Sequence, residues 1–141
     1  MKLGNTVIFG DSYSTFLGYI PEGYAVYYTP TYFTAHMNRA IAYSRLGHIA
    51  QALKDFDIAE QLRKEEPMLY FNRGVAYYNI KQYEKAVEDF SHAIMYAPQN
   101  PRFFLERARA LDKAGYPANA YADLEEAIAA LSNIIGNDEI A

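Results

Sequence analysis

The 141-residue sequence contains no cysteine, and this absence excludes several kinds of chemistry. Without thiols the chain cannot form disulfides, thiolate zinc sites, iron–sulfur clusters or a cysteine nucleophile. We therefore expect no metal site and no cofactor.

Basic residues and long apolar runs are also scarce. The chain has 13 Lys and Arg against 17 Asp and Glu, a net charge of -4, whereas proteins that bind nucleic acids usually carry a basic surface. No apolar run is long enough to span a bilayer, and Gly4, Asn5 and Thr6 interrupt the stretch that a secretory peptide would need. We expect a cytoplasmic protein that binds neither nucleic acid nor membrane.

Aromatic residues are abundant but unevenly placed. The chain has 14 Tyr and 8 Phe with no Trp, and residues 1–32 hold six of the Tyr and two of the Phe beside only three charged residues. Glycine and proline divide this stretch into short pieces. Residues 7–9 and 25–28 are typical of short strands. The pattern predicts an irregular or short-β N-terminal arm over residues 1–32.

The rest of the chain is built from a repeated sequence pattern. One block recurs at residues 37–43, 71–77 and 105–111, and a second recurs with the same offset at 53–59, 87–93 and 121–127. Each unit contains two stretches of helical periodicity. The expected helices span residues 33–46, 49–63, 67–80, 83–96, 101–114 and 117–132, and Pro117 is tolerated because it falls in the first turn of its helix.

This pattern resembles the tetratricopeptide repeat, whose unit is a helix-turn-helix of about 34 residues. The resemblance assigns repeats to residues 33–66, 67–100 and 101–134, with a C-terminal tail at 135–141. It implies an all-α fold in which the three repeats stack into a right-handed superhelix. Small residues at Ala40, Gly74 and Ala108 would let the two helices of each unit approach closely.

The resemblance also implies that the first helix of each repeat lines a concave groove that binds a protein or peptide partner. This groove is apolar over its first two repeats and charged at its end, and it either receives a partner or is covered by the N-terminal arm of the chain itself. The ten expected contact residues are Met37, Ile41, Met68, Phe71, Asn72, Val75, Tyr78, Arg102, Leu105 and Arg109. One subclass of the family grips the C-terminal carboxylate of chaperone peptides, but Met37, Ile41 and Glu106 stand where it needs Lys, Asn and Arg.

Residues 6–30 are similar to the opening of SGNH, or GDSL-type, hydrolases. A short apolar strand runs into Gly10-Asp11-Ser12, and the resemblance would make Ser12 the nucleophile of an ester hydrolase. A serine triad also needs a base and a group that orients the base. The available pair, Asp89 and His92, lies inside the second helix of the middle repeat. We therefore expect an interaction scaffold without catalysis, with the hydrolase or a remnant of one as the alternative.

The last repeat leaves one edge of the stack uncovered except by the short tail. Ile134, Ile135 and Ile140 are the apolar residues that could cover it. Such an edge could also form a homodimer through the last repeat.

Overall fold

The computed structural model describes residues 25–140, with side-chain detail over residues 32–136. These residues form six α-helices and no strand. The helices are α2 (Ala25–Arg45), α3 (Ile49–Leu62), α4 (Pro67–Asn79), α5 (Tyr83–Tyr96), α6 (Pro101–Ala114) and α7 (Pro117–Ile140). None of the described helices is both long and apolar enough to cross a membrane. The all-α prediction is confirmed for this part of the chain.

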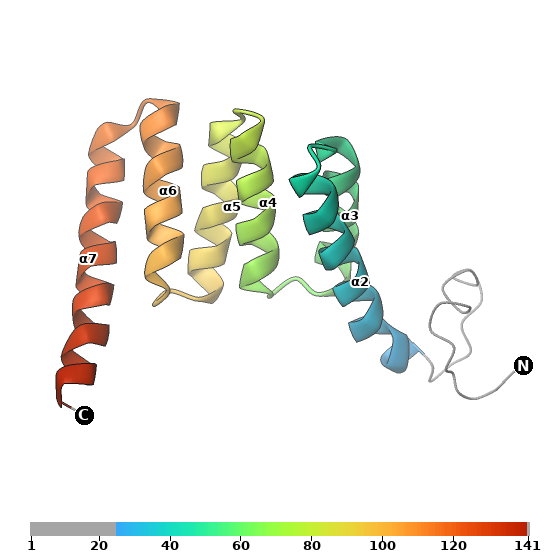
Figure 1. Ribbon diagram of the computed structural model, residues 1–141, viewed down its shortest axis with the longest axis horizontal. Helices are drawn as coiled ribbons and strands as arrows, with labels where there is room; N and C mark the ends of the chain where they lie inside the picture. Colours follow the sequence, from blue (N-terminus) through green and yellow to red (C-terminus); the bar gives the residue numbers. More distant parts are fainter. Residues whose placement is uncertain (1–24, 141) are drawn as a thin grey trace, which may run out of the picture.

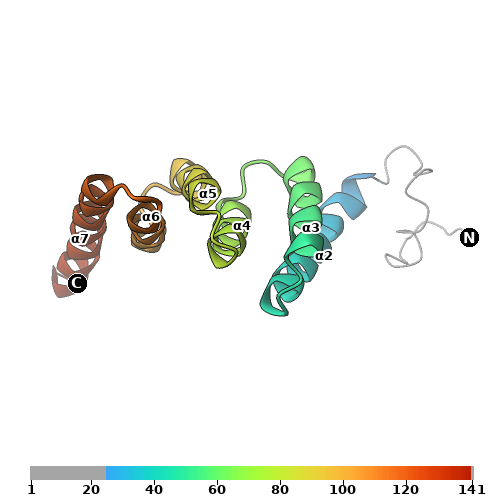
Figure 2. The ribbon, with the colours of Figure 1, turned by 90° about the horizontal axis from the view of Figure 1, so that it is seen from above.

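The helices follow one another in a row, so α2 and α7 lie at its opposite ends (Figure 1). Seen from above, α4 and α5 lie on opposite sides of the row (Figure 2), and Phe71 on α4 packs against Phe103 on α6. Each helix packs mainly against its neighbours in sequence, and α2 also touches α4. The first helices of the hairpins, α2, α4 and α6, therefore belong to one side of the array.

The helix ends follow from local chemistry that recurs from one repeat to the next. Pro67 and Pro101 begin α4 and α6, where a missing N–H costs no hydrogen bond, and the side chain of Asn100 accepts a hydrogen bond of 3.0 Å from the backbone N–H of Arg102. Gly47 and Gly115 end their helices with positive φ angles of 85° and 98°. The matching position in the middle repeat holds Lys81, with φ 66°.

Two predicted boundaries at the ends of the array are wrong. The strand expected over residues 25–28 is helical, because α2 begins at Ala25 rather than at residue 33. The tail expected at 135–141 is also mostly helical, because α7 continues to Ile140. In both places the helix extends beyond the repeat unit, so the repeat pattern gave no signal for it. The first strand, at residues 7–9, lies outside the described residues.

The core lies between the helices of each hairpin and continues through the first two repeats. Its largest fully buried side chains are Leu69, Phe56, Phe90 and Phe103. Gly74 lies so close to Phe90 that a Cβ added at this glycine would stand 2.7 Å from the ring. The predicted close approach is therefore confirmed in the middle repeat. In the third repeat, Ala108, Leu111 and Ala120 form a separate and smaller cluster.

Candidate interaction surface

The ten predicted contact residues all lie on the first helices, two on α2, five on α4 and three on α6. We call the surface formed by these ten residues the first-helix face. Met37 and Phe71 are only 7% and 4% exposed and belong to the core. Met68 and Leu105 are each 42% exposed, and the remaining apolar members are half-buried. The solvent-accessible part of the face is thus smaller than the sequence predicted.

Two arginines from α6 lie on aromatic rings from α4 and bring positive charge to the first-helix face. The guanidinium of Arg102 lies 4.9 Å from the ring centroid of Phe71, and that of Arg109 lies 5.9 Å from the centroid of Tyr78. Stacking of this kind holds an arginine in place while its N–H donors stay available. Arg109 makes one ion pair, of 3.6 Å, with Glu106, and its side chain remains 60% exposed. Both guanidinium groups can therefore receive a carboxylate.

Asn72 offers less than the sequence suggested. Its side-chain nitrogen donates a hydrogen bond of 2.8 Å to the backbone carbonyl of Met68 within the same helix. The second N–H of this amide and its oxygen remain available to a partner. Asn72 is half-buried, and on the face it can both donate one hydrogen bond to a partner and accept from it.

A second set of charged residues ties the helices together and recurs in every repeat. Nε and Nη2 of Arg39, Arg73 and Arg107 donate to both carboxylate oxygens of Asp55, Asp89 and Asp123 at 2.7–3.0 Å. Each arginine on a first helix thus forms a bidentate ion pair with the aspartate that follows it by 16 residues, on the second helix of the same hairpin. Bidentate pairs of this kind fix geometry as well as supply energy.

The third nitrogen of the arginine reaches back to the preceding repeat. Nη1 of Arg73 donates to Asp57 and Glu60 at 2.8 and 2.9 Å. Nη1 of Arg107 donates to the hydroxyl of Ser91 at 3.0 Å. These bonds connect one hairpin to the one before it. We did not assign this role from the sequence, although the constant spacing between the recurring Arg and Asp was the signal that could have revealed it.

The pKa values of the middle pair, Arg73 and Asp89, depend on burial and on the number of hydrogen-bond partners. Burial opposes the positive charge of Arg73, but hydrogen bonds to Asp89 and Glu60 outweigh it and raise the pKa of this guanidinium. Burial also raises the pKa of Asp89, and the hydrogen bonds from Arg73 offset this only in part. Arg73 has three carboxylate partners, whereas the side chain of Asp89 is hydrogen-bonded, among the described residues, by Arg73 alone.

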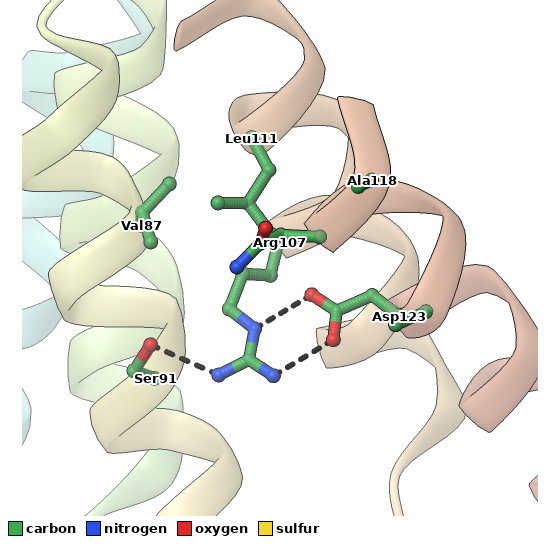
Figure 3. A pocket seen from close by; sticks show the side chains of 8 residues that line it. Val87, Ser91, Arg107, Leu111, Ala118 and Asp123 are labelled. Atoms are coloured by element: carbon green, nitrogen blue, oxygen red, sulfur yellow. Dashed lines mark hydrogen bonds and ion pairs between the residues drawn. The ribbon is translucent and has the colours of Figure 1, made fainter. Parts of the chain in front are cut away.

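A hollow of about 510 Å³ lies between α5, α6 and α7 (Figure 3). Arg107 crosses it and donates to Asp123 and Ser91, while Val87 and Leu111 form apolar walls. The donors of Arg107 that face the hollow are thus engaged within the chain. Among the described residues, no three His, Asp or Glu side chains are grouped so that they could hold a metal ion.

The residues considered for a hydrolase do not form an active site in the described part of the chain. Asp89 is 4% exposed and bonded to Arg73. The ring of His92 stacks on Tyr70 at 5.0 Å between centroids, and its Nδ1 is buried. Both side chains therefore make packing or ion-pair contacts within the repeat, Asp89 with Arg73 and His92 with Tyr70. Ser12 lies outside the described residues.

Three hairpins in a row, each held by an equivalent ion pair at a constant spacing, define a helical-repeat protein. The family model for the tetratricopeptide repeat matches residues 67–100, so the middle hairpin is a tetratricopeptide repeat. No curated protein sequence matches the chain.

Solved structures with a similar fold extend this result to the other hairpins. The second tetratricopeptide-repeat domain of Spaghetti, bound to the HSP90 peptide SRMEEVD, has a TM-score of 0.66 and 22% identity, covering 70% of this chain and 86% of that one. The Yersinia enterocolitica type III secretion chaperone SycD, in complex with a peptide of the translocator YopD, has a TM-score of 0.68 and 21% identity, covering 76% and 82%. MamA has a TM-score of 0.71 and 15% identity, covering 90% and 77%. The described residues thus have the tetratricopeptide-repeat fold, and nothing in these similarities supports the hydrolase resemblance.

Proposed function

We propose that this chain is a protein-interaction scaffold that binds a peptide across the first-helix face and performs no chemistry of its own. The observation that carries the proposal is the pair of exposed arginines, Arg102 and Arg109, stacked on rings beside an apolar surface. An apolar surface gives affinity, and oriented guanidinium groups give direction to a peptide that carries carboxylates. The Spaghetti and SycD structures, which carry bound peptides, support this use of the fold.

The distribution of side chains indicates which peptides fit. The α2 and α4 part of the face offers Ile41, Met68 and Val75, which are at least partly exposed and apolar. The α6 part offers the two arginines. A fitting peptide therefore places apolar side chains over α2 and α4 and acidic side chains over α6. The N-terminal arm, which has few charges, remains the competing occupant of the apolar part.

Fluorescence anisotropy with two labelled peptides tests the proposal. Both carry Leu and Met in one half, and the other half carries Glu in the first peptide and Lys in the second. The Glu peptide should bind more tightly, and Arg102→Ala or Arg109→Ala should each weaken it about tenfold, the value of one charge-assisted hydrogen bond. The matched control is Arg45→Ala, because Arg45 is exposed at the end of α2 outside the first-helix face.

Two results would contradict the proposal. Equal binding of the Glu and Lys peptides would show that Arg102 and Arg109 do not select for acidic side chains. Turnover of p-nitrophenyl acetate that disappears in Ser12→Ala would show that the chain is a hydrolase. When the Glu half is at the N-terminus of the peptide, amidating the C-terminus should leave the affinity unchanged, because the α2 and α4 part of the first-helix face has no cationic side chain to bind a terminal carboxylate.

A further inference from the structure

The last helix presents an apolar stripe that no described helix covers. Tyr121, Leu124, Ile128, Leu131 and Ile135 follow one another at intervals of three and four residues, so they share one side of α7. Their exposed fractions are 66%, 42%, 62%, 39% and 57%. Among the described helices, α7 has α6 as its one main neighbour, as its place at the end of the row shows (Figure 1).

The same positions are covered in the preceding repeat. Val87 and Ile94 are the equivalents of Tyr121 and Ile128 one repeat earlier, and both pack against the core. They lie on α5, which α6 follows and covers. The exposed stripe on α7 is therefore equivalent to the surface of α5 on which the next repeat packs, and no described helix packs on it.

At the opposite edge of the array, no described helix precedes α2. Leu69 and Ala76 on α4, and Phe103 and Ala110 on α6, are at most 2% exposed. The equivalent residues on α2 are Ala35 and Ala42, and both are exposed. Small side chains on α2 leave room for the large ones on α7.

Ion-pair partners are also left over, one at each edge. Inside the array, Nη1 of an arginine reaches an acceptor on the second helix of the preceding repeat, as Arg73 reaches Asp57 and Arg107 reaches Ser91. Glu125 stands at this acceptor position in the third repeat, where it is exposed and makes no hydrogen bond or ion pair with a described residue. Arg39 stands at the donor position in the first repeat. Its Nε and Nη2 hold Asp55, its side chain is 61% exposed, and its Nη1 meets no described acceptor.

The charges of the two terminal helices are of opposite sign. Residues 25–45 contain two arginines and no acidic residue. Residues 117–140 contain five acidic residues and no Lys or Arg. Two copies of α7 packed on each other would bring like charges together, whereas α7 against α2 brings opposite charges together.

We propose that copies of this chain associate head to tail, with the α7 edge of one copy packed on the α2 edge of the next. Nη1 of Arg39 in the second copy then donates a hydrogen bond to Glu125, just as Nη1 of Arg73 donates to Asp57 within the chain. Because the two surfaces differ, such contacts do not close as a two-fold dimer and instead continue the array. The proposal does not depend on the first-helix face or on what that face binds.

Sedimentation velocity of the full chain at increasing concentration tests this assembly. The average mass should rise with concentration, and the rise should weaken at high salt. Ile128→Arg blocks only the α7 edge and Ala42→Arg blocks only the α2 edge, so each variant alone should remain a monomer. An equimolar mixture of the two should form a species of twice the monomer mass, because each still offers one intact edge. The matched control is Met95→Arg, a change at a residue that is 59% exposed on α5, which should assemble like the unchanged chain.

Several outcomes would overturn the proposal. A chain that stays monomeric at every concentration would show that the edges are covered from within, for example by residues 1–24. A dimer that survives Ala42→Arg but not Ile128→Arg would show two-fold packing of α7 on α7. Glu125→Lys should lower the association several-fold without affecting folding, because Glu125 has no described partner, and unchanged association would refute the ion pair.

Discussion

Replacing Gly74 by alanine should destabilise the protein, although alanine is the better helix former. Gly74 lies within α4, where the substitution alone would gain about 1 kcal/mol of helix propensity. The new Cβ would stand 2.7 and 2.8 Å from two atoms of the Phe90 ring and 3.1 Å from a third, whereas carbon atoms in contact prefer about 3.5–4.0 Å. Overpacking a core costs about 1–3 kcal/mol, and three overlapping atoms favour the upper end. The net loss should be about 2 kcal/mol.

The ring cannot move away cheaply, because Phe90 is 1% exposed and its centroid lies 5.8 Å from that of Phe71. A smaller partner should therefore change the sign of the effect. The third repeat already pairs Ala108 with Leu124 at the equivalent positions. In a Phe90→Leu background, Gly74→Ala should lose the overlap and stabilise the chain by up to about 1 kcal/mol.

Urea unfolding followed by circular dichroism at the helix band measures all four chains of this cycle, since the sequence has no Trp to report by fluorescence. The reasoning would be refuted if Gly74→Ala raised the stability of the original chain. It would also be refuted if the loss were the same in both backgrounds, because the ring would then not be its cause.

Three further results are expected. Lys81→Gly should raise the stability by about 1 kcal/mol in urea unfolding, because Lys81 holds a φ of 66° that glycine adopts freely; no change would mean that this angle carries no strain. Burial opposes the charge of Asp55, but hydrogen bonds from Arg39 and His36 outweigh it and lower its pKa. Its stabilising contribution is thus complete above the unfolded value of about 3.9 and lost as the pH falls through the lower folded pKa, so Asp55→Asn should flatten the acid limb of a stability profile. Burial and Glu60 raise the pKa of Tyr70 to about 12. Ring-labelled NMR should show a late-titrating tyrosine signal that is missing in Tyr70→Phe, and the stability tied to the neutral form of Tyr70 should fade as the pH rises from about 10 through 12.

The repeat period allowed most of the fold to be predicted from the sequence. It placed α5 and α6 at their observed bounds and the starts of α3, α4 and α7 at the observed residues. Periodicity carries this information because each hairpin must bury the same stripe against the same kind of neighbour. The terminal helices α2 and α7 each have a described neighbour on one side, and at their outer ends, Ala25 and Ile140, the pattern failed.

The candidate surface was less predictable than the helices. Phe71 and Val75 occupy equivalent kinds of position on α4, yet Phe71 is 4% exposed because it packs near Phe103 on α6, with 5.2 Å between the ring centroids. Arg102 then covers this ring from outside. Which side chain is covered depends on the packing of neighbouring hairpins, and a helical pattern alone does not contain that information.

The division of the core has a consequence for how the protein opens. The larger cluster joins the first two hairpins and reaches Phe103 on α6, whereas Ala108, Leu111 and Ala120 form a small cluster of their own. In a linear array, each unit is stabilised only by itself and its immediate neighbours. The amide protons of α7 should therefore exchange with solvent through local opening well before those of α4 and α5. In an isolated chain, the edge that we expect to meet a second copy would then be less protected than α4 and α5, and association would slow its exchange.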